Sequence, residues 1–326
     1  MPTKSFTAYR LRFTGPLHIA DSRDDYGTSL RSISSDTMYA ALTATLAKMD
    51  KEIPADGDLG CVISALFPFY RKDFSQSPIL FFPKPLALSL PRLTKENAAE
   101  AKKMKKVKWV DRDYLQDILA GKDVFASPPV GSHLKGEFLT SGDFDESFLV
   151  SEVLERVTVS RTFEDSKPFY MERLHFKGDS GLFFLVDGDT ALVDEALPLL
   201  SAEGIGTDRN VGNGTFEFEK EKLEVNLPDD AEYGVSLSTF IPEDKPQLES
   251  LLNGESVAYE LLRRGGWIAT PPYLSLRKNA IYAFAPGSVF HVFLSGSGRI
   301  VDLAPKGLVH HPIWRCGKAL VLPIKL

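Results

Sequence analysis

The residues best suited to chemistry lie in a glycine-rich segment, residues 204–214, which reads Gly-Ile-Gly-Thr-Asp-Arg-Asn-Val-Gly-Asn-Gly. Glycine allows positive φ angles and lets a ligand approach the backbone closely. Exposed N–H groups beside one arginine would suit the phosphodiester backbone of a nucleic acid. A helix C-cap followed by a tight turn would explain one or two of these glycines, but not all of them. We therefore predict a binding loop with the contact residues Gly204, Gly206, Arg209, Asn210, Gly212 and Gly214.

Two known glycine motifs do not fit this segment. The dinucleotide-binding fingerprint requires a third glycine where Arg209 stands, with a strand before the motif and a helix after it. The phosphate-binding loop of nucleoside triphosphatases ends in Gly-Lys-Ser or Gly-Lys-Thr, whereas this chain has Gly-Thr-Phe at 214–216. The segment therefore indicates neither nucleotide-binding fold, and we expect no cofactor.

Signatures of catalysis and of metal binding are weak. His310, His311 and Cys316 are three possible ligands, but no second cluster accompanies them, and neighbouring residues on a strand face opposite ways. The motifs Gly-x-Ser-x-Gly and His-Glu-x-x-His do not occur, so we expect no metal site and no catalytic residue. Asp36 heads an amphipathic helix, where capping is its expected role. His18, in the loop after the first predicted strand, is either a ligand or base, or a surface histidine.

Two other segments combine positive charge with aromatic rings. Lysines crowd residues 102–108, immediately before Trp109, a pattern typical of either a solvated helix face or a phosphate contact. Between residues 160 and 175, cations are mixed with aromatic rings, which is the combination that single-stranded RNA requires. The residues concerned are Arg161, Lys167 and Arg173, together with Phe163, Phe169 and Tyr170.

The overall charge limits the kind of nucleic-acid site. The 326 residues include 38 Lys and Arg against 44 Asp and Glu, a net charge of −6, whereas a general nucleic-acid binder carries a basic surface. Any such site must be a local patch or be shared with other subunits. Cys61 and Cys316 lack paired spacing, which excludes a disulfide framework and indicates a reducing cytoplasm. We expect no membrane span, because the charge-free runs are far shorter than the roughly 20 apolar residues that a span needs.

Hydrophobic periodicity predicts the elements that position these residues. They are a strand at 6–13, a helix after Asp36, strands at 153–162 and 181–186, a helix at 190–200 and a strand at 215–219. The two middle strands, joined by about 15 residues, predict an extended hairpin. Pro198 predicts a kink or an early end in the second helix. The order of these elements is that of a ferredoxin-like sheet, the fold of RNA-recognition modules.

We therefore predict an α+β protein of two ferredoxin-like domains. The first, residues 1–225, includes a Lys-rich insertion at about 83–150, the projecting hairpin at about 160–178 and the glycine-rich loop. The second, residues 226–326, is a shorter variant. Its predicted elements are a strand at 234–240, a helical region within 246–264 and strands at 289–294 and 319–324.

Six blocks of the chain resemble a known family, and they occur in the same order. The blocks are residues 15–18 (Gly-Pro-Leu-His), residues 34–42, the Lys-rich insertion ending in Lys108-Trp109, residues 156–161 (Arg-Val-Thr-Val-Ser-Arg), the glycine-rich loop and residues 311–318 (His-Pro-Ile-Trp-Arg-Cys-Gly-Lys). Together they resemble the repeat-associated (RAMP) RNA-binding superfamily of CRISPR systems. More closely, they resemble the subunit of the type III-A (Csm) effector complex that holds the 5′ tag of the crRNA.

The resemblance implies a non-catalytic role in antiviral defence, with two ferredoxin-like domains and a thumb-like hairpin that interrupts guide–target pairing. The implied partners are the crRNA 5′ tag, the large signalling subunit, the first backbone RAMP subunit and, indirectly, the target RNA. Carried over by position, Arg209 and the loop glycines line the tag path, His18 and Arg31 lie near the tag, and residues 161–177 hold the thumb. Asp208 departs from the family pattern and adds a negative charge beside that path.

Two other functions remain open at this stage. The chain could be a metal-independent crRNA-processing endoribonuclease of the same superfamily, with His18 as the acid–base residue, helped by Tyr26 or Lys48. It could also be a purely structural assembly subunit that makes no direct RNA contact. The acidic total favours a component of a larger ribonucleoprotein, in which neighbouring subunits supply part of the positive field.

Overall fold

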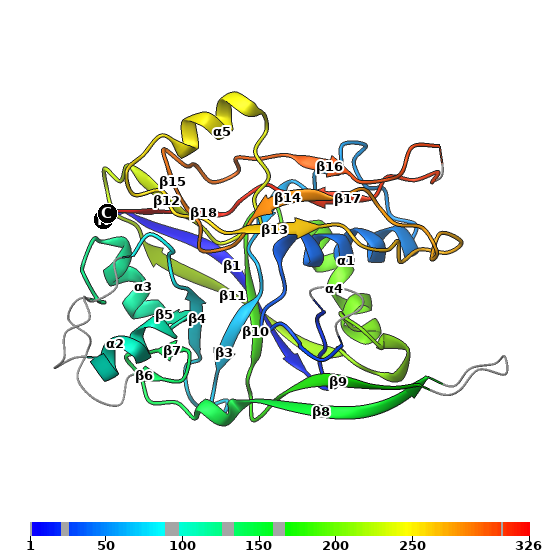
Figure 1. The fold of residues 1–326 in the computed structure, drawn as a ribbon, viewed down its shortest axis with the longest axis horizontal. Coiled ribbons are helices and arrows are strands. Elements are labelled where there is room, and N and C mark those ends of the chain that lie inside the picture. The colour runs from blue at the N-terminus through cyan, green and yellow to red at the C-terminus, as the bar shows by residue number, and fades with distance from the viewer. Residues whose placement is uncertain (1, 21–25, 89–97, 126–133, 159–166, 308) are drawn as a thin grey trace.

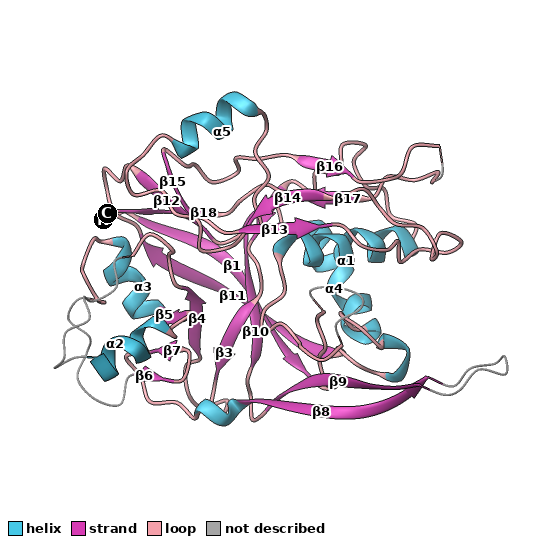
Figure 2. Ribbon diagram, viewed as in Figure 1, coloured by secondary structure: helices cyan, strands magenta, loops and turns pink. Residues whose placement is uncertain are grey.

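The structure is a computed structural model that describes residues 2–20, 26–88, 98–125, 134–158, 167–307 and 309–326. Its architecture is mixed α+β, with one large sheet and few helices (Figure 1, Figure 2). The large sheet has the strand order β11-β1-β10-β3-β4-β5-β7-β6, and β2 also pairs with β10. Its strands are β1 (Thr3–Phe13), β2 (Cys61–Ile63), β3 (Phe67–Tyr70), β4 (Ile79–Pro83), β5 (Trp109–Asp111), β6 (Leu134–Lys135), β7 (Phe138–Leu139), β10 (Gly181–Gly188) and β11 (Phe216–Asn226).

Strand β1 lies next to the edge strand β11 and is antiparallel to β10 on one side and to β11 on the other. Its alternate side chains enter two different cores, because successive residues of a strand face opposite sides. Tyr9 and Leu11, both fully buried, pack with the apolar faces of α1 (Ser35–Lys48) and α4 (Ala191–Glu203). Phe6 and Ala8 join the core on the opposite side.

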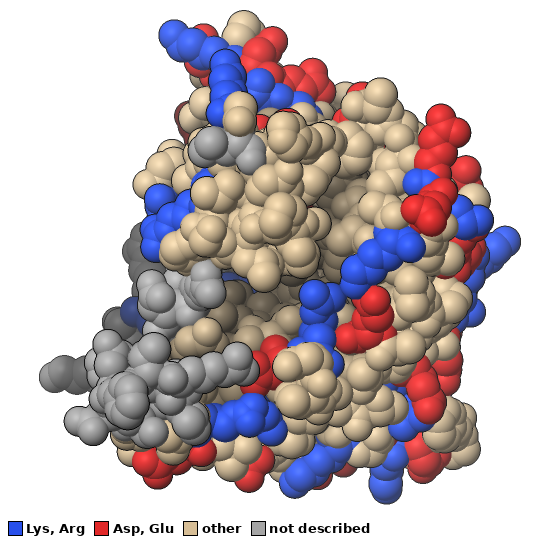
Figure 3. Space-filling model, turned by 90° about the vertical axis from the view of Figure 1, so that its right-hand side faces the viewer, with Lys and Arg blue, Asp and Glu red and all other residues tan. Residues whose placement is uncertain are grey.

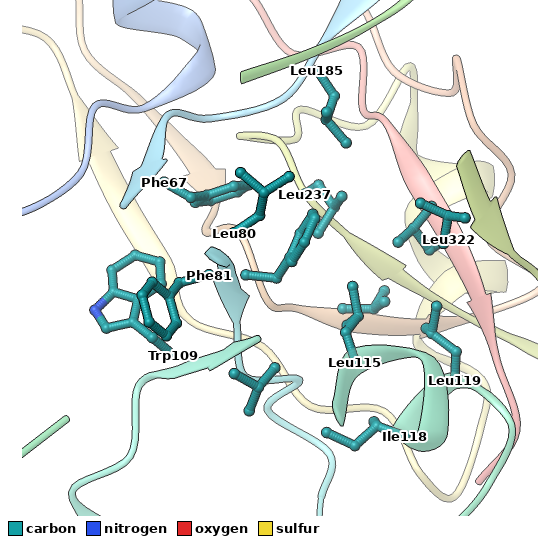
Figure 4. Close-up of a cluster of buried hydrophobic side chains, with 14 of the residues drawn as sticks. Phe67, Leu80, Phe81, Trp109, Leu115, Ile118, Leu119, Leu185, Leu237 and Leu322 are labelled. Carbon is teal, nitrogen blue, oxygen red and sulfur yellow. The ribbon is translucent and has the colours of Figure 1, made fainter. Parts of the chain in front are cut away.

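The second core connects the large sheet to the C-terminal part of the chain. Figure 4 shows Leu115, Ile118 and Leu119 of α3 (Arg112–Leu119) facing the same cluster as Leu237 and Leu322. The remaining element of the insertion is α2 (Ala98–Lys105), and a 3-10 turn, Glu146–Phe148, precedes the next strand. The predicted boundary near residue 226 is thus crossed by one continuous hydrophobic core.

The C-terminal part consists of short strands around an aromatic cluster centred on Phe240 and Phe290. One sheet has the order β15-β12-β18, and two further pairs are β13–β14 and β16–β17. The elements are β12 (Tyr233–Ser236), α5 (Lys245–Leu252), β13 (Leu261–Arg264), β14 (Ile281–Phe284), β15 (Val289–His291), β16 (Ile300–Asp302), β17 (Trp314–Cys316) and β18 (Val321–Ile324).

The projecting hairpin contains the first of the two predicted strands but pairs it with a different partner. Strand β8 (Leu149–Thr158) pairs with β9 (Lys167–Phe176), and Figure 1 shows both running along the lower edge of the view. The predicted partner at 181–186 is instead β10, which lies in the large sheet between β1 and β3. The pairing prediction is wrong for a physical reason: residues 181–186 are all buried, so this apolar strand needs cover on both faces, which a free hairpin does not offer.

Helix α4 does not end early at Pro198, because it continues to Glu203. Pro198 lacks only its own N–H donor, and the hydroxyl of Ser201 donates to its carbonyl at 2.8 Å. Within the described ranges, no helix is long and apolar enough to cross a membrane.

Candidate nucleic-acid interface

The glycine-rich loop follows α4 directly and folds back against the segment after β1. Gly204, with a φ of 78°, ends the helix. The Ile205 N–H donates to the Gly214 carbonyl at 3.0 Å, which closes the base of the loop. The Thr207 N–H donates to the carbonyl of His18 at 3.0 Å, and the Gly214 N–H donates to Pro16 at 2.8 Å. Residues 16–18 and the loop, almost 200 residues apart in sequence, therefore form one backbone-bonded unit.

Three of the four glycines are required by this close packing. A Cβ atom at Gly204 would lie 2.5 Å from the Asn213 carbonyl oxygen, and one at Gly206 would lie 2.5 Å from that of His18. At Gly214 it would overlap the carbonyl oxygen of Ile205. Only Gly212 has open space around it, although its φ of 85° still favours glycine. The number of glycines, which the sequence associates with ligand approach, thus has a cause within the fold itself.

What the loop offers a ligand is its outer turn, a 3-10 helix at Arg209–Val211. Arg209 and Asn210 are exposed, and the Arg209 guanidinium has no ion-pair partner in the described part of the chain. Asp208 sits in the left-handed region with a φ of 60°, and its carboxylate accepts from Arg156 of β8 at 2.7 Å. This ion pair offsets the negative charge beside Arg209 and ties the loop to the hairpin.

An open groove lies along this turn. Figure 3 shows the face at the right of Figure 1, which is hollowed across its middle, with Lys and Arg side chains on either side of the hollow. Residues from three parts of the chain line the groove: Lys48, Ala202, Glu203, Gly206, Asp208, Arg209, Asn210 and Leu274. Lys48 and Glu203 form an ion pair at 2.6 Å, so Arg209 is the cation of this lining whose charge is not offset by a described residue.

His18 is fully buried, so its alternative assignment as a surface histidine is wrong. Its Nδ1 lies 2.7 Å from the carbonyl oxygen of Glu172 in β9, and its ring lies beside that of Tyr26 with centroids 6.1 Å apart. Nε2 has no hydrogen-bond partner among the residues that the structure describes. His18 thus joins the glycine-rich loop, through its carbonyl, to the base of the hairpin, through its ring.

The other predicted contact residues lie apart from the loop. Arg31 is exposed and approaches Glu137 of the insertion at 3.5 Å, so the structure groups it with the insertion. Arg173 faces Glu152 across the hairpin, and its Nε is buried without a partner in the described ranges. Lys167 begins β9 opposite Thr158. Arg161 and Phe163 lie outside the described residues.

The aromatic residues of the two cationic segments differ in exposure. Tyr170 on the hairpin is 60% exposed, whereas Phe169 is partly covered by Tyr26, with ring centroids 5.3 Å apart. Trp109 is buried against Phe67 (Figure 4), so it is not a stacking surface beside the lysines. The described lysines of the 102–108 run are exposed, while Met104 between them is buried. That segment therefore has one buried face and one solvated, basic face.

Asp36 does not cap α1, because it is buried and bound to arginines from the C-terminal part of the chain. The Nε of Arg264 donates to its carboxylate at 2.8 Å, and the Nε of Arg315 lies 3.8 Å from the same oxygen. Burial opposes ionisation, yet the charges of Arg264 and Arg315 hold the pKa of Asp36 below its ordinary value. The residue before the helix is Ser34, whose carbonyl accepts from the N–H groups of Thr37 and Met38.

The sequence does carry a signal for this part of the molecule, which local motif reading misses. Residues 261–318 contain eight Lys or Arg residues and a single acid, Asp302, in a chain whose net charge is −6. The acidic total therefore conceals a strongly basic C-terminal segment. Leu274, which lines the groove together with residues of the glycine-rich loop, belongs to this segment.

Comparison with known proteins supports a single family. Residues 229–324 match the family model of the CRISPR Csm4 C-terminal domain. The chain is 26% identical to the CRISPR system Csm4 protein of Mycobacterium tuberculosis over 318 residues, which covers 92% of this chain and 93% of that protein. It is 23% identical to that of Streptococcus thermophilus, over 87% of this chain and 88% of the relative. Residues 229–324 thus form a Csm4 C-terminal domain, and the chain resembles Csm4 proteins over nearly its whole length.

Solved structures of Csm4 proteins have the same fold. A Csm4-containing structure described as a Csm1–Csm4 cassette with cA4 aligns with a TM-score of 0.62 at 20% identity, over 99% of both chains. One described as a Csm3–Csm4 subcomplex of the type III-A interference complex also aligns with a TM-score of 0.62, at 16% identity, over 99% of this chain and 100% of the other. The agreement over the whole length includes the part that precedes the Csm4 C-terminal domain.

Proposed function

We propose that this Csm4-like chain is a non-catalytic RNA-binding subunit of a type III-A CRISPR interference complex, and that it holds the 5′ tag of the crRNA. The observation that carries the proposal is the groove beside the glycine-rich loop, where the charge of Arg209 is not offset by a described partner. A charged donor on a preformed turn suits a phosphodiester, because the fold has already fixed the geometry of the contact. Leu274 of the basic segment 261–318 also lines this groove.

The finer architecture is part of the same proposal. We assign residues 1–225 and 226–326 to two ferredoxin-like domains that share a core, with the insertion at about 83–150 in the first. The β8–β9 hairpin would act as the thumb that interrupts guide–target pairing. Tyr170, Val153 and Val157 are more than half exposed on it, and Tyr170 offers a stacking surface for a base.

Two partner surfaces are expected in addition to the RNA. The structural relatives are described as a Csm1–Csm4 cassette and a Csm3–Csm4 subcomplex. By analogy, this chain would anchor the large signalling subunit and contact a backbone RAMP subunit in the cytoplasm, and it would meet target RNA indirectly. The net charge of −6 suits such a role, since neighbouring subunits would supply part of the field around the RNA.

An endoribonuclease function has less support. It would need His18 as the acid–base residue, but that ring is fully buried and its Nδ1 is occupied by the Glu172 carbonyl. A general base must come within hydrogen-bond reach of the reacting hydroxyl. Lys48, which could assist His18 in that mechanism, lines the groove but is already paired with Glu203.

The decisive experiment purifies the complex from its native host through the tagged wild-type chain and through Arg209→Ala. Loss of one charge-assisted hydrogen bond costs about 1–3 kcal/mol, or roughly 5- to 150-fold in tag-RNA affinity. Lys245→Ala is the matched control, because Lys245 is an exposed cation on α5, paired only to Glu249 in the described chain. Short RNAs with one constant 5′ end should be recovered with the wild type and the control. Equal crRNA retention by Arg209→Ala would contradict the loop assignment. Cleavage of repeat RNA in EDTA would favour the endoribonuclease function. An assembled complex in which this chain crosslinks to no RNA would favour a structural subunit.

A further inference from the structure

Two arginines contact one carboxylate where the C-terminal part of the chain meets the first turn of α1, and a lysine lies within electrostatic range of all three. The arginines are Arg264 at the end of β13 and Arg315 in β17, and the lysine is Lys278 in the segment before β14. The carboxylate is Asp36, which is 1% exposed. The residues come from four separate segments, so only the fold brings them together.

The charges of this cluster do not balance. Asp36 is the only carboxylate that pairs with these cations in the described chain. Arg264 donates to Asp36 through Nε and to Ser34 and Thr37 through Nη2 at 2.9 and 2.8 Å, and no hydrogen bond of its Nη1 to a described residue is found. The cluster therefore retains an excess of two positive charges.

The other two cations also have unused donors. Arg315 donates through Nη1 to the backbone carbonyl of Asp36 at 3.1 Å, but its Nε is buried and has no hydrogen-bond partner among the described residues. The Lys278 ammonium makes no hydrogen bond or ion pair to a described residue either, although its backbone N–H donates to Gly266. Partly buried cations that outnumber their counter-ions are destabilising unless a further anion accompanies them.

The Lys278 ammonium responds to this environment. Burial, followed by repulsion from Arg315 and Arg264, lowers the pKa of Lys278 to about 8, and the attraction of Asp36 only partly opposes the shift. The N-terminus of α1 lies at the same place and adds the positive end of a helix dipole. Apart from Asp36 itself, the charges at this position favour a bound anion.

We propose that Lys278, Arg264 and Arg315, at the N-terminus of α1, form a binding site for a phosphate group, which supplies the negative charge that Asp36 alone does not provide. Guanidinium and ammonium donors beside a helix N-terminus are the combination that phosphate groups prefer in proteins. The site lies outside the glycine-rich loop and does not use Arg209.

The surrounding surface favours a phosphate of RNA over a free anion, an assignment that rests on the proposed function. The guanidinium of Arg277, which precedes Lys278 in the chain, stacks on Trp267, 4.8 Å from the ring centroid. A cation and an aromatic ring close to a phosphate site suit a single-stranded nucleic acid. The same segment, residues 265–280, includes Leu274 of the groove, so the site continues the proposed RNA path.

The test compares the full-length wild-type chain with Lys278→Met, which removes the ammonium but keeps a long apolar side chain. Inorganic phosphate is titrated while the melting temperature is followed. The wild type should be stabilised in a saturable way, and Lys278→Met should respond at least threefold less, because a ligand stabilises only the state that binds it. Without phosphate, the variant should be at least as stable as the wild type, since an unpaired charge has been removed. Lys245→Met on α5 is the control and should respond like the wild type.

A second arm uses RNA that carries the 5′ tag. Lys278→Met should weaken RNA binding about tenfold, and inorganic phosphate should compete for that part of the affinity. Arg209→Ala should weaken RNA binding while leaving the phosphate response intact, so failure of the loop assignment and failure of this site are distinguishable. Equal phosphate responses in wild type and Lys278→Met would overturn the proposal. A specific phosphate response with unchanged RNA affinity would refute RNA as the source. Unchanged phosphate and RNA binding with weakened large-subunit binding would overturn the proposal in favour of a protein carboxylate.

Discussion

Replacing Asp36 by alanine should reveal how strongly the C-terminal part of the chain depends on one buried carboxylate. Asp36 lies on α1, yet its side chain meets Arg264 at 2.8 Å, Arg315 at 3.8 Å and the Thr239 hydroxyl at 3.3 Å. Those three residues all belong to the C-terminal part. The substitution therefore removes the shared partner of two arginines and leaves the cations of the cluster without any carboxylate.

The size of the effect follows from this burial. Removing one partner of a buried ion pair costs about 3–5 kcal/mol, because the opposite charge stays desolvated and unpaired. Native proteins are stable by roughly 5–15 kcal/mol, so Asp36→Ala would remove a large share of that margin. For a chain of this size, the loss corresponds to a fall in melting temperature of about 4–7 °C.

Urea unfolding of the full-length protein measures the change, and Glu249→Ala is the matched control. Glu249 also pairs with a cation, Lys245, but the two side chains are 66% and 83% exposed. An exposed pair of this kind contributes about 0.5 kcal/mol or less. If Asp36→Ala changed the free energy of unfolding by less than about 1 kcal/mol, like the control, the carboxylate would not be an essential partner of the arginines.

The difference in stability between the wild type and Asp36→Ala should depend on pH. The pKa of Asp36 is held below its ordinary value of 3.8 in the folded state, so its ionised form stabilises the fold above that pH. This contribution is lost as the pH falls through the folded-state pKa. The stability difference between wild type and Asp36→Ala should therefore shrink below about pH 4, and a difference that stays constant in acid would show that the carboxylate charge is not its cause.

Three further predictions concern the loop, the buried lysine and the hairpin. Gly206→Ala should lower the free energy of unfolding by about 2–3 kcal/mol, since its Cβ would lie 2.5 Å from the His18 carbonyl oxygen. Gly212→Ala, with open space around its Cβ, should lower it by only about 1 kcal/mol. Equal losses in urea unfolding would show that close packing does not require Gly206. The pKa of Lys278 is about 8 in the folded state and 10.5 in the unfolded state, so the unfolded chain binds more protons between these pH values. The free energy of unfolding should therefore rise with pH across that window in the wild type but not in Lys278→Met. A flat wild-type profile would count against the lowered pKa. Replacing residues 158–167 by a short turn should preserve assembly but alter protection of target RNA near the tag, and an unchanged footprint would remove the thumb assignment.

Local sequence patterns anticipated the elements whose burial depends on near neighbours. The alternation at residues 6–13 predicts the strand observed as β1, and the spacing after Asp36 predicts α1. The glycine-rich segment is a turn between a helix and a strand, as its order predicts. Blocks of sequence in family order indicated a resemblance to the Csm4 family, which the comparisons confirm. All of these features depend on short segments of sequence, in which hydrophobic periodicity and turn-forming residues determine the local structure.

Side-chain environments were decided by contacts between distant segments. Trp109 resembles a stacking residue beside lysines, but tertiary packing buries it against Phe67. His18 lies in a loop, yet β9 and the glycine-rich loop enclose it. Strand β8 has two possible partners, and the choice of β9 depends on β10 being needed between β1 and β3.

The sequence by itself thus determined the order of most elements, the family resemblance and the position of the main loop. Only the tertiary structure decided that Asp36 joins two parts of the chain, because its partner Arg264 is 228 residues away and no local pattern links them. A carboxylate at the start of a helix has the same local pattern whether it caps the helix in water or neutralises arginines in a core. The difference lies in desolvation, which depends on every segment that surrounds the group and so exists only once the chain has folded.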